Sequence, residues 1–104
     1  QVNFTTNMTI TKLVLTITVQ RTGNATYHGD YNSDSKMTST YTQMSTEIIY
    51  NFFLLPNQEL TPNSYTCNVQ FDLSNANHTS SLDKYSIEIT NICGITSSAS
   101  GYFP

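Results

Sequence analysis

Three oxygen-bearing side chains stand at alternating positions in the first half of the chain, at Asp30, Asn32 and Asp34. The first three ligands of a calcium-binding EF-hand loop have the same spacing. The EF-hand itself is excluded, because Ser35 stands where that loop needs glycine and Tyr41 stands where it needs glutamate. We expect a polar turn stabilised by Asx hydrogen bonds, with a looser calcium site as the alternative.

Residue types that could do catalysis are present but show no catalytic arrangement. His28 and His78 are far apart in the sequence, and neither has a second ligand at metal-binding spacing, so both are expected on the surface. Serines and aspartates are plentiful, so the composition alone does not exclude a Ser-His-Asp catalytic site. However, the sequence contains no nucleophile elbow, no activated cysteine and no glycine-rich phosphate loop. The sequence therefore predicts a protein that is not an enzyme and needs no metal, no cofactor and no small-molecule substrate.

Four N-x-T sequons indicate a different chemistry, the attachment of N-linked glycans. A chain rich in Asn and Thr produces some sequons by chance. The presence of two cysteines and a charged fraction of only 11% nevertheless fit an extracellular glycoprotein. The rare variant Asn91-Ile92-Cys93 is discounted. We expect glycan on at least three of the four acceptor asparagines, which are Asn3, Asn7, Asn24 and Asn77.

The cysteines are expected to form a disulfide, because Cys67 and Cys93 are the only two and an extracellular compartment is oxidising. A hairpin between the last two strong strands, centred near Asn77, is an arrangement that would allow this bond. This pairing would place Cys67 opposite Thr90 and bring Cys93 within reach of it.

Length and charge restrict the possible partners. The chain has 104 residues, enough for one domain with a single core, and a formal net charge of −3. Its four Lys and Arg residues are spread along the whole chain, so no basic patch exists for nucleic acid or an anionic membrane. The strongest apolar run, 48–55, contains Asn51 and ends before Pro56, which makes it too short for a membrane span. We expect an extracellular domain, secreted or part of a cell-surface protein whose membrane anchor lies outside these residues.

Strict period-2 alternation predicts the strand around which the chain is organised. In 64–73, one side carries the apolar residues Tyr65, Cys67, Val69, Phe71 and Leu73, and the other side is polar. A helix would scatter these five side chains around its axis. The segment is therefore predicted as a half-buried β-strand.

The remaining pattern predicts an all-β fold. Strong strands are expected at 13–19, 45–55 and 85–90, and weaker, edge-like strands at 1–10, 25–31 and 36–43. No helical periodicity occurs, and turn residues recur about every ten residues. We expect six to eight strands in a two-sheet antiparallel Greek-key sandwich over residues 1–93, with 94–104 as a C-terminal tail or interdomain linker.

The segment Leu60–Leu73 resembles two related families of extracellular β-sandwiches. Tyr65-Thr66-Cys67 is similar to the Tyr-x-Cys of the sixth strand of immunoglobulin-like domains, where the tyrosine closes a corner. Leu60-Thr61-Pro62, followed by Tyr65 and Val69, is similar to a turn and strand of fibronectin type III domains. The chain departs from the immunoglobulin pattern because 13–19 has no cysteine and no tryptophan occurs anywhere. The resemblance implies a divergent immunoglobulin-like domain of an invertebrate cell-surface receptor, similar in character to cnidarian allorecognition receptors.

A stretch without sequons supplies candidate binding residues. It is rich in tyrosine and methionine, which are common at protein interfaces, and the alternative is that some of these side chains fill the core. The candidates are Tyr27, Tyr31, Met37, Tyr41 and Met44.

Two functions fit this sequence. One is a cell-surface recognition or adhesion domain that binds a protein on an opposing cell, with its own copy as the expected partner. The other is a fibronectin-like spacer without a ligand of its own. A glycan-free, partly apolar face would favour recognition, and a surface that is polar all round would favour the spacer. A carbohydrate-binding module is disfavoured, because no tryptophan platform is available.

Overall fold

Short β-strands make up most of the structure. The computed structural model describes residues 1–72 and 80–103. The strands are β1 (Val2–Thr5), β2 (Ile10–Gln20), β3 (Thr26–Asn32), β4 (Met37–Gln43), β5 (Glu47–Leu54), β6 (Ser64–Asp72), β7 (Lys84–Asn91) and β8 (Thr96–Tyr102), with short 3-10 helices η1 (Thr22–Asn24) and η2 (Ser80–Leu82). Within the described residues, neither helix is long enough to cross a membrane.

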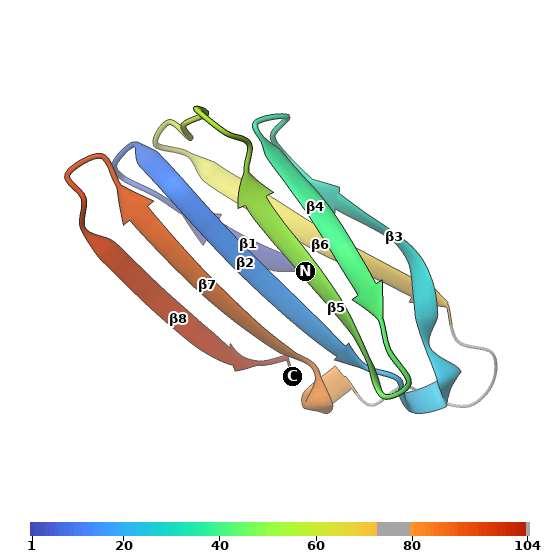
Figure 1. The fold of residues 1–104 in the computed structure, drawn as a ribbon. Coiled ribbons are helices and arrows are strands. Elements are labelled where there is room, and N and C mark those ends of the chain that lie inside the picture. Colours follow the sequence, from blue (N-terminus) through green and yellow to red (C-terminus); the bar gives the residue numbers. More distant parts are fainter. Residues whose placement is uncertain (73–79, 104) are drawn as a thin grey trace.

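The strands form two antiparallel sheets that pack together, as Figure 1 shows. The small sheet has the order β1-β6-β3, and the large sheet has the order β4-β5-β2-β7-β8. Side chains from the facing sides of both sheets form one buried cluster, for example Leu15 and Phe52 from the large sheet and Cys67 from the small sheet. The predicted all-β, two-sheet antiparallel sandwich is confirmed.

The strand order agrees with that of an immunoglobulin constant domain in the middle of the chain and differs at both ends. Such a domain has seven strands, A to G, in sheets ordered A-B-E-D and C-F-G. When β2 to β6 are compared with strands B to F, β4-β5-β2 and β3-β6 have the same neighbours. The place of strand A beside β2 is taken by β7, and the place of strand G beside β6 is taken by β1.

The hairpin that would bring the two cysteines together does not form, because β6 and β7 lie in different sheets. Cys67 pairs with Val2 and Asn32 in the small sheet, whereas Thr90 pairs with residues of β2 and β8. Asn77, the predicted centre of the hairpin, lies outside the described residues.

The predicted disulfide is also absent from the structure. Both cysteines are free: Cys67 is buried in the core, and Cys93 is exposed in the turn between β7 and β8. Without the hairpin, no strand pairing brings these two residues together.

The segment predicted as a tail or linker instead contains β8, an edge strand of the large sheet. The turn before it is held by the side chain of Asn91, which accepts hydrogen bonds from the backbone N–H groups of Cys93 and Ile95. Gly94 adopts a φ of 79°, which glycine tolerates without strain. The domain boundary therefore does not fall at residue 93. The error arose because Thr, Ser, Ala and Gly in β8 show no apolar alternation.

The tyrosine corner at the start of β6 is present. The Tyr65 hydroxyl donates a hydrogen bond to the carbonyl oxygen of Thr61, four residues earlier in the chain. The Tyr65 ring is buried and stacks on Phe4 of β1 at a centroid distance of 5.5 Å. This contact fixes the turn that leads into the central strand of the small sheet.

We predict that Tyr65→Phe lowers the free energy of unfolding by about 1 kcal/mol, because the substitution removes this hydrogen bond and leaves the Thr61 carbonyl without it. Tyr31→Phe is the matched control, since the Tyr31 side chain is 56% exposed. Chemical denaturation of both variants measures the difference. Equal losses in the two variants would contradict a special role for the corner.

A second prediction concerns the thiols. A thiol reagent at pH 8 should modify one thiol in the native chain, Cys93, and two after denaturation without reductant. Burial, followed by the charge of Asp30, raises the pKa of the Cys67 thiol to about 12, so this group stays protonated as well as shielded. Two thiols that remain unreactive after denaturation would instead indicate a disulfide.

Candidate functional site

The five candidate binding residues do not share one face. Met37 is part of the core, with only 4% of its surface exposed. Tyr31 lies on the outer side of the small sheet, where it pairs with Asn68. Met44 is exposed in the turn between β4 and β5. Only Tyr27 and Tyr41 are in contact with each other.

Tyr27 and Tyr41 join the two sheets at the side where β3 and β4 meet. Their rings stack at a centroid distance of 3.5 Å and an angle of 4°. Asp30 accepts hydrogen bonds from the hydroxyls of Tyr27 and Ser39, and the Tyr27 N–H donates to the side chain of Gln43. These contacts close this side of the sandwich, which indicates a structural role for the pair.

Burial supports the same interpretation for the neighbouring tyrosines. Burial and then the charge of Asp30 raise the pKa of Tyr27. Burial, followed by the proximity of Tyr27, also raises the pKa of Tyr50, whose hydroxyl donates to the carbonyl of Gln70 at 2.8 Å. Both phenols therefore stay protonated at neutral pH and act as hydrogen-bond donors.

The calcium-loop spacing corresponds to an Asx-stabilised turn. The Asn32 side chain accepts a hydrogen bond from the N–H of Asp34, and the Asp34 carboxylate accepts one from the N–H of Lys36. The Asp30 carboxylate accepts hydrogen bonds from the hydroxyls of Ser39 on β4 and Tyr27 on β3. Over residues 1–72 and 80–103, no group of three His, Cys, Asp or Glu residues could hold a metal ion.

His28, which was expected on the surface, is exposed. His28 Nδ1 lies 2.9 Å from the carboxylate of Asp72, and both side chains are more than half exposed. His78 lies outside the described residues.

The glycan acceptors within the described residues are all exposed. Asn3 lies on the outer side of the small sheet and accepts a hydrogen bond from the Thr66 hydroxyl. Asn7 lies in the turn between β1 and β2, and Asn24 ends η1. Asn77 lies outside the described residues. None of the three described acceptors lies on the outer side of the large sheet.

The outer side of the large sheet is a broad surface built mainly of hydroxyl side chains. Inward burial of Leu15, Ile17 and Phe52 fixes which residues point outward. We call this surface the hydroxyl face. The strand registers align its residues in three rows: Thr38, Phe53, Val14, Glu88 and Ser98; Thr40, Asn51, Thr16, Ser86 and Ser100; and Thr42, Ile49, Thr18, Lys84 and Tyr102.

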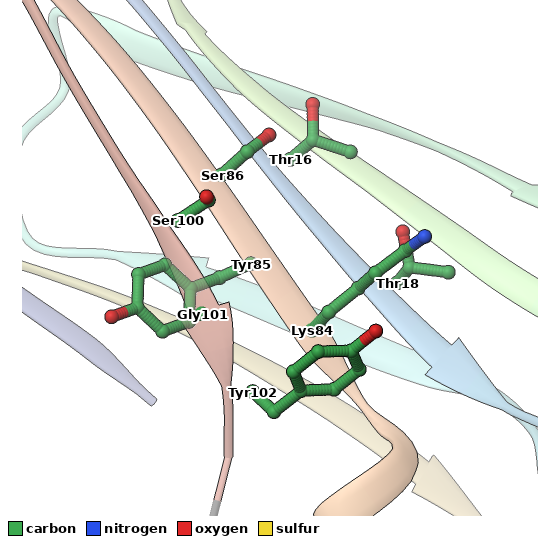
Figure 2. A pocket seen from close by; sticks show the side chains of 8 residues that line it. All are labelled: Thr16, Thr18, Lys84, Tyr85, Ser86, Ser100, Gly101 and Tyr102. Atoms are coloured by element: carbon green, nitrogen blue, oxygen red, sulfur yellow. The ribbon is translucent and has the colours of Figure 1, made fainter.

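A hollow lies on the hydroxyl face over β2, β7 and β8. Figure 2 shows the hydroxyl-bearing side chains of Thr16, Ser86 and Ser100 side by side, with Lys84 and Tyr102 together near Thr18. These residues offer hydrogen-bond donors and acceptors, one ammonium group and one aromatic ring. None of the lining residues is a carboxylate or an imidazole.

The hydroxyl face has apolar area and balanced charge in addition to hydroxyls. Val14 is 39% exposed and Tyr102 is 68% exposed, while Ile49 and Phe53 are partly buried. Two lysines, Lys12 and Lys84, and two glutamates, Glu47 and Glu88, lie on this outer side, so its positive and negative charges balance. The face is thus neutral in a chain of net charge −3.

Sequence reasoning missed this face because it looked for aromatic and thioether residues. The alternating Thr and Ser residues of β2 and β7 were a usable signal, since they occupy the side opposite the apolar positions. The contribution of β8 could not be found, because the strand itself was not predicted.

Comparison of the chain with protein-family models, with curated proteins and with solved structures gave no match.

Proposed function

We propose that this domain is a recognition domain of a cell-surface or secreted protein and that it binds a protein partner through the hydroxyl face. A second copy on an opposing cell is the proposed partner. The observation that carries the proposal is the position of the glycan acceptors: Asn3 occupies the outer side of the small sheet, and the described acceptors leave the hydroxyl face clear.

The chemistry of the face supports contact with a copy of itself. Hydroxyl groups can both donate and accept hydrogen bonds, so two hydroxyl faces can satisfy each other in more than one register. The opposite charges of Lys84 and Glu88 avoid the repulsion that two like-charged surfaces would suffer across a twofold axis. Val14 and Tyr102 add exposed apolar area that association would bury. A weak contact of this kind suffices where many copies act together on a membrane.

The proposed ancestry is a divergent immunoglobulin-like domain. Two observations support it: the Tyr65 corner and the neighbour relations of β2 to β6. Both are compatible with the loss of the usual core disulfide and tryptophan.

The extracellular proposal predicts glycosylation. When the protein is made in a secretory pathway, enzymatic deglycosylation followed by intact mass measurement should show at least three occupied sites among the four sequons. Asn3, Asn7 and Asn24 are exposed and accessible to the transferase. A mass equal to that of the bare polypeptide before deglycosylation would contradict the proposal.

The proposed face can be tested with Ser86→Arg, which places a long cation in the central row. We expect aggregation of beads coated with the protein to weaken by about tenfold or more, because two such faces would bring like charges together, and a tenfold change needs only about 1.4 kcal/mol. Gln70→Arg, on the exposed outer side of the small sheet, is the matched control and should aggregate like the wild type.

Tyr31→Asp tests the small sheet as the alternative binding surface, because Tyr31 lies on its outer side. Loss of aggregation with Tyr31→Asp and not with Ser86→Arg would move the binding surface to the small sheet. If beads coated with the wild type do not aggregate at all, the recognition proposal fails and the spacer function replaces it.

A further inference from the structure

The last strand, β8, is an edge strand that is exposed on both of its faces. It lies at the margin of the large sheet in Figure 1, and within residues 1–72 and 80–103 its one partner strand is β7. Every residue from Thr96 to Ala99 is exposed, and so is Ser100. The strand is attached at its end by Phe103, whose ring packs edge-on against Tyr85 at a centroid distance of 5.6 Å. Little of β8 contributes to the core.

Other sheet edges in the described part of the chain are protected. β1 has only four residues, and β3 has a bulge between Tyr27 and Gly29 and carries Asp30. β4 is fastened to β3 through the Ser39–Asp30 hydrogen bond and the tyrosine stack. Proteins normally block long edges with charges, proline or bulges. β8 has seven residues and none of these features.

Two backbone hydrogen bonds determine which groups of β8 face the free edge. The Asn91 N–H donates to the carbonyl of Ile95, and the Phe103 N–H donates to the carbonyl of Asp83. In an antiparallel pair, hydrogen-bonded and non-hydrogen-bonded residues alternate. The residues of β8 that bond to β7 are therefore Ser97, Ala99 and Gly101.

The backbone N–H and C=O groups of the other four residues point away from β7, toward the free edge. These residues are Thr96, Ser98, Ser100 and Tyr102. They form a row of donors and acceptors ready to pair with another extended strand.

We propose that β8 pairs with β8 of a second copy, antiparallel about a twofold axis at Ala99. This register uses all four outward residues: Thr96 pairs with Tyr102 of the second copy, and Ser98 pairs with Ser100 of the second copy. It also places Ala99 opposite Ala99 of the second copy as a non-hydrogen-bonded pair, where Cα atoms approach to about 4.5 Å and small side chains fit best. The two large sheets then form one continuous sheet.

The sequence of β8 suits this pairing with itself. The strand has no charged residue, so no like charges face each other across the axis. The nearest acidic residue, Glu88, lies one strand further in and pairs with Ser98. The two Glu88 side chains would be separated by three strand spacings, about 14 Å, which exceeds the screening length of about 8 Å at physiological salt. This pairing uses the edge of the sheet and does not depend on what the hydroxyl face binds.

A cysteine placed on the proposed axis tests the register. In a Cys93→Ser background, which removes the exposed thiol, Ala99→Cys should form a disulfide-linked dimer on mild oxidation, because Cα atoms about 4.5 Å apart are within disulfide range. Ser97→Cys in the same background is the matched control. It would face Gly101 of the second copy and should remain uncrosslinked. Equal crosslinking of the two variants would overturn the register.

Loss of the outward N–H tests the pairing itself. Sedimentation of the full chain should show a concentration-dependent dimer, and Ser98→Pro should abolish it, because proline removes a donor that faces the free edge. Ser98→Thr should retain the dimer. The thermal midpoint of Ser98→Pro should stay within a few degrees of wild type, since no bond to β7 is lost. A wild type that is monomeric at every concentration, or a dimer that persists in Ser98→Pro, would overturn the proposal.

The hydroxyl-face contact and the β8 edge pairing can be tested independently of each other. Ser86→Arg should leave the β8 dimer in solution intact, because Ser86 lies on β7 and its side chain projects from the face of the sheet, not from the free edge of β8. If Ser86→Arg abolished the dimer and Ser98→Pro preserved it, the contact would belong to the hydroxyl face and the edge pairing would be refuted.

Discussion

The pairing of β2 with a strand on each of its sides is the constraint on which the large sheet depends. β2 bonds to β5 through Val14–Gln20 and to β7 through Ile10–Thr18. Its inward residues Leu13, Leu15 and Ile17 are almost completely buried, and each such side chain contributes about 2 kcal/mol. A register slip of one residue would turn all of them to solvent. Since β4 is attached through β5 and β8 through β7, every row of the hydroxyl face passes through β2.

The sequence predicts the strands that build the core and fails where alternation is absent. Strands β2, β5, β6 and β7 could be located because an apolar side chain recurs at every second position. β8 could not be located in this way, because both of its faces are exposed and neither carries a repeating apolar residue. The partners of each strand were also beyond reach, since alternation says which side of a strand is buried and not which strand lies beside it. The wrong β6–β7 hairpin, and with it the wrong disulfide, follows from this limit.

The candidate site was less predictable than the fold, for a related reason. Residue type suggested Tyr27, Met37 and Tyr41 as binding residues, but buried and edge-closing positions favour the same large side chains as interfaces do. The hydroxyl face consists of threonines and serines that are individually unremarkable. Only the registers of five strands bring them into rows, so the surface exists at the level of strand pairing and not at the level of a sequence motif.

The place of β7 beside β2 also has a consequence for how the chain folds. The centre of the large sheet joins Leu13 to Ile89, near opposite ends of the sequence. A ladder of this kind must wait for a long loop to close, and folds dominated by such distant pairings reach the native state in milliseconds to seconds. During synthesis, one edge of β2 therefore stays without its partner strand until β7 has left the ribosome. The exposed stripe of Leu and Ile in β2 is thus the segment that most needs protection from aggregation in the nascent chain.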